Sequence, residues 1–177
     1  MGVSRMKSWM LVCAAALAMT GAAALAQPPA VMKSAMSDLS NNAKGFAGHV
    51  HATEAPGGVL IMVEVTGLTP GWHGMHLHEK GDCSAADFTS SGGHLNHPTA
   101  KKAHGLLNPA GPDYGDLPNL YVAGDGTGKA EAFTDLVKFA QLTDTDGSAL
   151  VIHANKDDHL AQPIGGAGAR VACAVIK

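Results

Sequence analysis

Residues Gly71–Cys83, which read GWHGMHLHEKGDC, place three histidines within six residues. Only Leu77 separates His76 from His78, so in an extended segment both imidazoles leave the same face of the strand and can reach one ion. His73 falls on the opposite face and is predicted to support the site rather than to bind the ion. Because a His-x-His pair alone is also typical of a half-exposed strand, its interpretation depends on the rest of the chain.

The first 26 residues have the features of an export signal. Arg5 and Lys7 precede an apolar run over residues 9–20, and residues 24–26 read Ala-Leu-Ala, a small-x-small cleavage pattern. A membrane anchor is the alternative, but the run is short for a bilayer span and no charged flank follows it. The sequence therefore predicts that residues 1–26 are removed and that the mature chain begins near Gln27.

The remaining residues, 27–177, are the size of one domain with a sizeable core. After the loss of Arg5 and Lys7, ten basic and 15 acidic residues remain, which gives a net charge of −5. The chain has no basic stripe, so nucleic acid is excluded as a partner. No membrane association is expected once the signal has been cleaved.

Two cysteines, Cys83 and Cys173, lie outside the signal. An even pair in an exported protein favours a disulfide, whose loop of about 90 residues would stabilise the fold by roughly 4.5 kcal/mol in the chain-entropy model. Two free thiols that join a metal site are the alternative, although neither cysteine belongs to a CxxC pair.

The sequence pattern from Phe46 onward predicts an all-β fold. Short apolar or alternating segments are separated by turns rich in glycine and proline, and no segment has a helical period. A β-sandwich or barrel is therefore expected over residues 46–177, with residues 27–45 as an arm that leads into it. The predicted strands are 48–54, 59–66, 74–79, 119–123, 130–133, 149–153 and 170–176.

Two stretches, 82–118 and 156–169, do not fit as strands. Loops of such length in a small domain are usually functional or held in place. The candidate ligands in and beside them are His94, His97, His104, Asp113, Asp116, His153, Asp157 and Asp158. Clustered histidine and aspartate favour copper or zinc over magnesium or calcium, which prefer shells of oxygen.

Six motifs in order carry a family resemblance: GWHGMHLHEKGDC, SGGHLN (91–96), AHG (103–105), GDLPNL (115–120), VIHANKDD (151–158) and GGAGARVAC (165–173). From about Phe46 to Lys177 the chain resembles the copper/zinc superoxide dismutases, in their bacterial exported form. The resemblance implies an immunoglobulin-like, eight-stranded Greek-key β-barrel with a long metal-binding loop and a shorter second loop. It also implies a periplasmic enzyme that dismutes superoxide.

The resemblance assigns roles to individual residues. It implies that copper binds His76, His78, His94 and His153, and that His94 bridges copper to a zinc ion held by His104 and Asp116. It implies that Asp157 links His76 to His104, and that Cys83 pairs with Cys173. It also implies catalytic roles for two residues: His94 would supply a proton to the product, and Arg170 would attract superoxide.

One departure from the family concerns zinc. Asp113 stands where the family usually has a third zinc histidine. A carboxylate can ligate zinc, so the predicted zinc ligands are His94, His104, Asp113 and Asp116, with weakened zinc binding. His97 is a substitute ligand only if the loop folds differently. His49 and His51 form a second His-x-His pair outside the family pattern and are interpreted as structural.

Two other functions stay open. A dismutase-like protein that binds or buffers copper with little turnover would fit an altered zinc site, although such a carrier has no need of Arg170. A structural β-domain with vestigial metal residues should bind no copper tightly. The sequence also leaves open whether the protein is a monomer or a homodimer.

Overall fold

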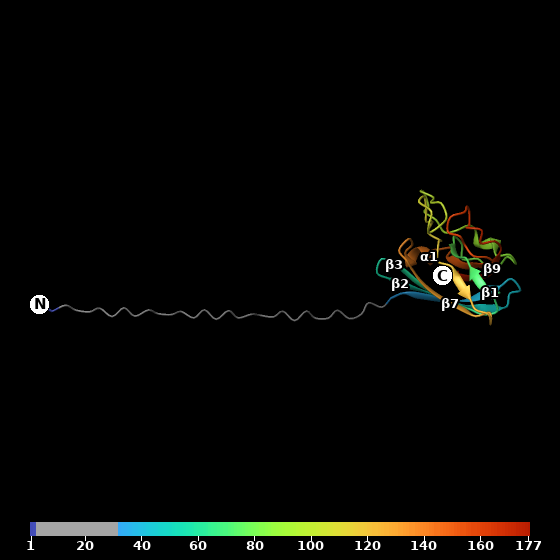
Figure 1. The fold of residues 1–177 in the computed structure, drawn as a ribbon, viewed down its shortest axis with the longest axis horizontal. Coiled ribbons are helices and arrows are strands. Elements are labelled where there is room, and N and C mark those ends of the chain that lie inside the picture. Colours follow the sequence, from blue (N-terminus) through green and yellow to red (C-terminus); the bar gives the residue numbers. More distant parts are fainter. Residues whose placement is uncertain (3–31) are drawn as a thin grey trace. The chain divides into compact units, whose positions relative to one another are not determined.

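The computed structural model describes residues 1–2 and 32–177, so the predicted export signal falls almost wholly outside the described residues. Residues 32–177 form an antiparallel β-barrel (Figure 1). Two short helical segments, η1 (Thr89–Ser91) and α1 (Phe139–Leu142), accompany the strands. The strands are β1 (Ser34–Asn41), β2 (Phe46–Ala55), β3 (Gly58–Val65), β4 (Gly71–His73), β5 (Met75–His78), β6 (Leu120–Val122), β7 (Gly128–Thr134), β8 (Ser148–His153) and β9 (Arg170–Ile176). The predicted all-β class is confirmed.

The barrel closes at Gly74. The strand order is β4-β6-β7-β3-β2-β1-β9-β8-β5, and β4 and β5 at its two ends are consecutive in the chain. Gly74 lies between β4 and β5: its N–H donates to the Asn155 carbonyl and its carbonyl accepts from His153 N–H at the end of β8. A Cβ at this position would lie 2.9 Å from the Ala167 Cβ, so only glycine allows the approach. The expected eight strands therefore appear as nine, because one strand is divided here.

Residues 34–41, which were predicted as part of an arm, form strand β1. This prediction was wrong: β1 pairs with β2 from Ser34 to Ser40, and Ser40 and Asn41 pair with β9. The strand escaped notice because its sequence, SAMSDLSN, has little hydrophobic alternation. Leu39 is its one fully buried side chain among the described residues. Main-chain pairing on both sides, rather than side-chain burial, keeps β1 in the sheet.

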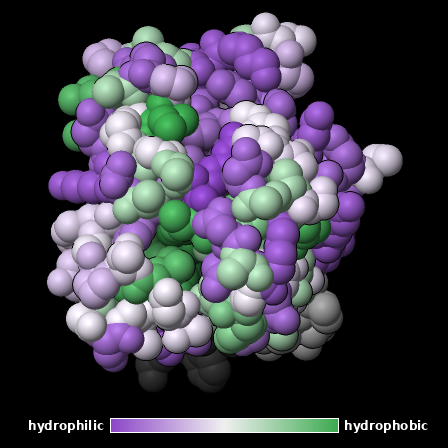
Figure 2. Space-filling view, turned by 90° about the vertical axis from the view of Figure 1, so that its right-hand side faces the viewer, coloured by the Kyte–Doolittle hydropathy of each residue, from purple (hydrophilic) through white to green (hydrophobic). Residues whose placement is uncertain are grey.

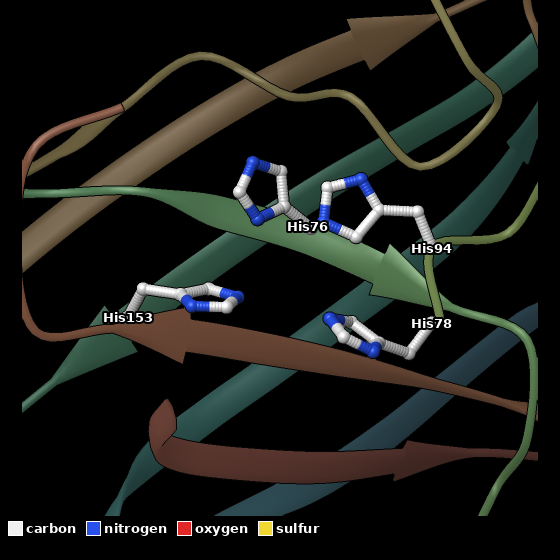
Figure 3. Close-up of side chains that lie close together, drawn as sticks. All are labelled: His76, His78, His94 and His153. Carbon is white, nitrogen blue, oxygen red and sulfur yellow. The ribbon is translucent and has the colours of Figure 1, made fainter. Parts of the chain in front are cut away.

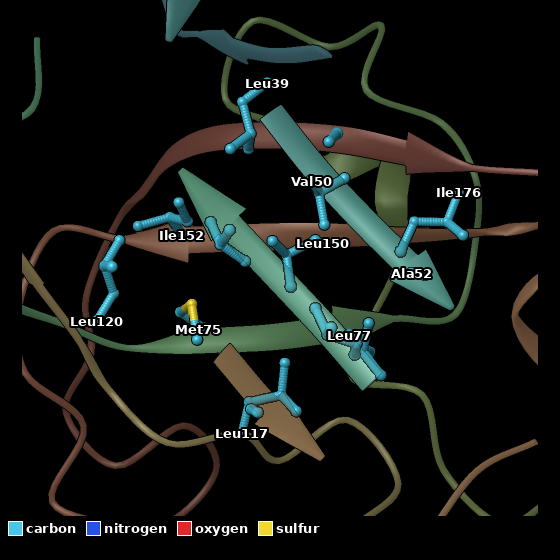
Figure 4. Close-up of a cluster of buried hydrophobic side chains, with 14 of the residues drawn as sticks. Leu39, Val50, Ala52, Met75, Leu77, Leu117, Leu120, Leu150, Ile152 and Ile176 are labelled. Carbon is cyan, nitrogen blue, oxygen red and sulfur yellow. The ribbon is translucent and has the colours of Figure 1, made fainter. Parts of the chain in front are cut away.

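The barrel interior holds most of the hydrophobic core (Figure 4). All six residues of β8 are buried, since one face meets this interior and the other is covered by the long loop 82–118. Phe88 from that loop packs with Ala149, Val151 and Cys173 in a smaller cluster. Beside it, Cys83 and Cys173 form the predicted disulfide, with a Cα–Cα distance of 5.9 Å. The loop that carries the candidate ligands is therefore fixed to the barrel wall.

The described surface mixes hydrophilic and hydrophobic residues, as one face in Figure 2 shows. No helix within residues 1–2 and 32–177 is long and apolar enough to span a bilayer.

Candidate metal centre

Four histidines converge at the outer face of the barrel, beneath the long loop (Figure 3). His76 and His78 come from β5, and His153 ends the neighbouring strand β8. His94 belongs to the long loop but reaches β5 through a bridge to His78. One ring nitrogen of each histidine lies within 4.8 Å of the others, so the sheet register brings together residues far apart in the sequence.

Hydrogen bonds to the opposite ring nitrogens orient these imidazoles. His78 Nδ1 lies 3.0 Å from the Gly92 carbonyl oxygen, and His153 Nδ1 lies 3.0 Å from that of Gly168. His76 Nε2 lies 2.9 Å from Asp157 Oδ2. Since these oxygens only accept, each contacting nitrogen carries the proton and the other keeps its lone pair. Within these four rings, the nitrogens left buried without a hydrogen bond to the described chain are His76 Nδ1, His78 Nε2, His94 Nε2 and His153 Nε2.

The environment keeps three of these rings neutral. Burial lowers the pKa of His76 to about 3, that of His78 to about 2 and that of His153 to about 4. Neutral imidazole is the form that binds metal, so these rings need not lose a proton first. Four inward lone pairs in a buried cluster fit a copper ion held by imidazole ligands.

A second group of ligand atoms adjoins the first through His94. His104 Nδ1 lies 2.5 Å from Asp116 Oδ1, and His94 Nδ1 lies 4.0 Å from the same oxygen. Both His104 Nδ1 and Asp116 Oδ1 are buried with no other hydrogen-bond partner. Ligand atoms at a tetrahedral zinc stand about 3.3 Å apart, since each lies about 2.0 Å from the ion. The two distances lie on either side of this value, and the imidazole and carboxylate donors suit zinc, with His94 shared between the two sites.

Asp113 lies beside this group, against the bridging ring. Its Oδ2 is 3.0 Å from His94 Nδ1, while its Oδ1 accepts from Gly115 N–H at 2.9 Å. Asp113 Oδ2 thus lies against Nδ1 of His94, the ring nitrogen that faces the second group of ligand atoms. The position suits a zinc ligand, but the same oxygen also competes with zinc for His94 Nδ1.

Asp157 lies between the two groups. Its Oδ2 accepts from His76, and its Oδ1 lies 3.1 Å from His104 Nε2. Although burial opposes its charge, the hydrogen bonds with His104 and His76 hold the pKa of Asp157 well below its usual value. Burial also opposes charge on His104, but Asp116 and Asp157 raise its pKa to about 10. One carboxylate therefore orients one ligand of each group.

The structure adds two residues that the sequence analysis did not assign. Asn119 donates from its amide to the Asp157 carbonyl and accepts from Asp157 N–H through Oδ1. His159 donates its backbone N–H to Asp157 Oδ1 at 2.7 Å. Asn119 lies within the GDLPNL motif, which could have marked it; nothing in the spacing marked His159.

Arg170 begins β9 directly opposite His153 of β8. Its guanidinium donates to the carbonyls of Phe88 and Gly92 and to Ser91 Oγ. A cavity of about 480 Å³ lies here. Its lining includes His78, His94, His153, Arg170, Lys101 and Lys102. Glu79 and Asp113 line it as well, so the cluster of histidines opens to solvent through a cavity in which three basic side chains face two carboxylates.

The remaining histidines lie apart from the ligand atoms. His73 is buried, with Nδ1 2.6 Å from the His153 carbonyl oxygen and Nε2 2.8 Å from that of Thr69. His97 Nδ1 accepts from Ala100 N–H within its own loop. His49 and His51 point outward from β2. His73 thus contacts the backbone of a candidate ligand, and the ligand groups include none of these four residues.

The barrel and the two adjoining ligand groups define a β-barrel protein with a histidine-bridged pair of metal sites. The family model described as "Copper/zinc superoxide dismutase (SODC)" matches residues 38–176. The chain belongs to the copper/zinc superoxide dismutase family, whose members use copper and zinc in an oxidoreductase reaction.

Individual relatives agree with this assignment. A copper/zinc superoxide dismutase of Caulobacter vibrioides is 57% identical over 137 residues, which cover 74% of this chain and 78% of the relative. One from Aquifex aeolicus is 39% identical over 149 residues, with 81% and 86% covered. A crystal structure of a superoxide-dismutase-like protein from Bacillus subtilis matches with a TM-score of 0.74 and 36% identity, over 83% of this chain and all of that one.

Proposed function

We propose that this protein dismutes superoxide to oxygen and hydrogen peroxide at the four-histidine site and that it does so in the periplasm. The observation that carries the proposal is the set of four inward histidine nitrogens beneath a cavity that also contains Arg170. His76, His78, His94 and His153 would hold copper. His94, His104 and Asp116, with Asp113, would hold zinc.

Copper bound there would supply one-electron redox chemistry, by which one superoxide is oxidised and a second is reduced. The product of the second requires two protons. His94 is positioned to carry one of them, because its Nε2 is in the cluster and its Nδ1 is held by Asp113 at 3.0 Å. A nitrogen that can both accept and release a proton beside the substrate acts as a general acid.

Arg170 would bind and orient the superoxide anion in the cavity. Its charge does not vary with pH, and its hydrogen bonds to the loop fix its position. Lys101 and Lys102 line the same cavity and add to its positive field.

Replacing Arg170 by alanine should lower kcat/KM about tenfold, because the cavity loses its fixed cation. The measurement is the dismutation rate against ionic strength at equal copper content, and the salt dependence should become shallower. Arg170→Lys should recover part of the rate, since it retains the charge but not the planar fork. An unchanged rate in Arg170→Ala would remove this residue from the mechanism.

Replacing Asp113 by histidine should tighten zinc binding by about tenfold or more, since the carboxylate that now competes for His94 Nδ1 is replaced by an imidazole that can ligate zinc. Competition against a zinc chelator measures the change. Asp113→Asn is the control, because it removes the charge without supplying an imidazole and should bind zinc more weakly than Asp113→His. Weaker zinc binding in Asp113→His than in the parent would mean that the carboxylate is the better ligand at this position.

Copper buffering with little turnover is the less favoured function. It accounts for the histidine cluster but not for a guanidinium and two lysines around the same cavity. The deciding experiment is the dismutation rate of the disulfide-bonded protein loaded with copper alone and with copper plus zinc. Fast turnover in either form supports the enzyme, and tight copper binding without turnover supports the buffer.

Export to the periplasm rests on the pattern of residues 1–26. Mass spectrometry of the protein isolated from periplasmic extract should give an N-terminus near Gln27. Retention of Arg5 and Lys7 in the isolated protein would contradict cleavage. A homodimer stays a prediction, which sedimentation of the loaded protein would test.

A further inference from the structure

The outer surface of strands β1, β2 and β3 carries a methionine-histidine-methionine row. Met36 of β1 lies directly opposite His51 of β2, and His51 lies directly opposite Met62 of β3. Facing residues on one side of an antiparallel sheet have Cβ atoms about 4.5–5.5 Å apart. The neighbouring residues Val50, Ala52, Ile61 and Val63 point into the core, so the three side chains of the row share the outward face.

The row lines a surface hollow of about 140 Å³ together with His49 and Glu64. Met36 is 72% exposed and Met62 is 40% exposed, whereas Met75 is buried in the core. Core packing therefore does not explain two methionines on this face. Both are thioethers on long, flexible side chains beside an imidazole, and all three can turn toward a common point.

The other two residues that line the hollow, His49 and Glu64, already contact side chains of opposite charge or hydrogen-bonding character. His49 Nδ1 lies 3.0 Å from Asp38 Oδ1, and Glu64 Oε1 lies 2.7 Å from Lys129 Nζ. The ring of His51 makes no hydrogen bond to any other described residue. The row of Met36, His51 and Met62 is thus a set of two thioethers and one imidazole with no competing partner in the described part of the chain.

We propose that Met36, His51 and Met62 form a binding site for a soft monovalent ion, with copper(I) as the physiological occupant. Thioether sulfur selects copper(I) over divalent ions that prefer nitrogen and oxygen. The site shares no residue with the four-histidine cluster, which lies on β5, β8 and the long loop. The barrel would then hold reduced copper on its outer face as well as the copper used in catalysis.

Silver(I), which is soft, monovalent and not oxidised by air, is the probe that tests this site. The protein is first loaded with copper and zinc, so that its catalytic sites are filled, and is then titrated with silver(I) against a competing chelator. The loaded protein should take up one further equivalent. The methionine methyl signals of Met36 and Met62 should shift in the NMR spectrum.

The matched variant is Met36→Leu/Met62→Leu, which retains side-chain volume and should fold normally. Its affinity for silver(I) should fall at least 100-fold, and His51→Gln should also weaken binding, while the dismutation rate stays unchanged. Met32→Leu, at a methionine that is 39% exposed and outside the row, should bind as the parent does. The proposal is overturned if the loaded protein takes up no further equivalent, or if the double variant binds as tightly as the parent.

Discussion

His78→Ala will reduce copper affinity and the dismutation rate by more than about 100-fold. Changes to residues that merely orient a metal ligand already cost about 10-fold to 100-fold, and loss of a ligand itself should cost more. His78 Nε2 is one of the four inward nitrogens, and no other side chain from β5 can replace it, because Leu77 points into the core. The variant also leaves the Gly92 carbonyl without its imidazole donor.

Copper content and rate should be measured on the same His78→Ala preparation. The control is His97→Ala, which removes a histidine from the long loop that covers the site but outside both ligand groups. We expect the control to retain the parent's rate within about twofold, in line with the small effects of most surface substitutions. If His78→Ala bound copper and turned over normally, the four-histidine assignment would fail.

The sequence named the side chains that the fold brings together at the candidate site, but not their geometry. The His-x-His spacing of β5 and the ordered motifs were enough to name every residue that contributes an inward nitrogen. The sequence could not predict the direction in which each imidazole ring points, since that depends on the carbonyls of Gly92 and Gly168 and on Asp157. These contacts join residues that are 14, 15 and 81 positions apart.

The fold was predicted in class, and the errors have physical causes. Strand β1 was missed because a sheet can retain a strand by main-chain pairing when its side chains show no pattern. The division at Gly74 was missed because it depends on the close approach of Ala167 from the second loop. The Met36, His51 and Met62 row could not be seen at all, since it exists only through the register of three strands.

Removal of the disulfide should have the largest effect on stability. Cys83 and Cys173 are 90 positions apart, and the chain-entropy model gives roughly 4.5 kcal/mol for a loop of that size. For a domain of this length each 1 kcal/mol shifts Tm by about 2–4 °C. The double variant Cys83→Ser/Cys173→Ser should therefore melt about 10 °C lower or more, which calorimetry of the zinc- and copper-loaded proteins would measure.

The same variant should also lose activity, because the disulfide holds the loop that positions Arg170. The guanidinium bonds to Phe88, Ser91 and Gly92, which all follow Cys83 in that loop. A loop released at Cys83 lets these acceptors move, and Gly92 also orients His78. We expect the rate to fall at a temperature well below the variant's Tm, where the barrel is still folded.

Reduction of the parent protein separates this effect from that of the serine side chains. A reductant should lower the Tm and the rate of the parent to those of the double variant, and should leave the double variant unchanged. Circular dichroism at the assay temperature shows whether the barrel persists. If the reduced parent kept its full rate with a lowered Tm, the disulfide would stabilise the barrel without positioning Arg170.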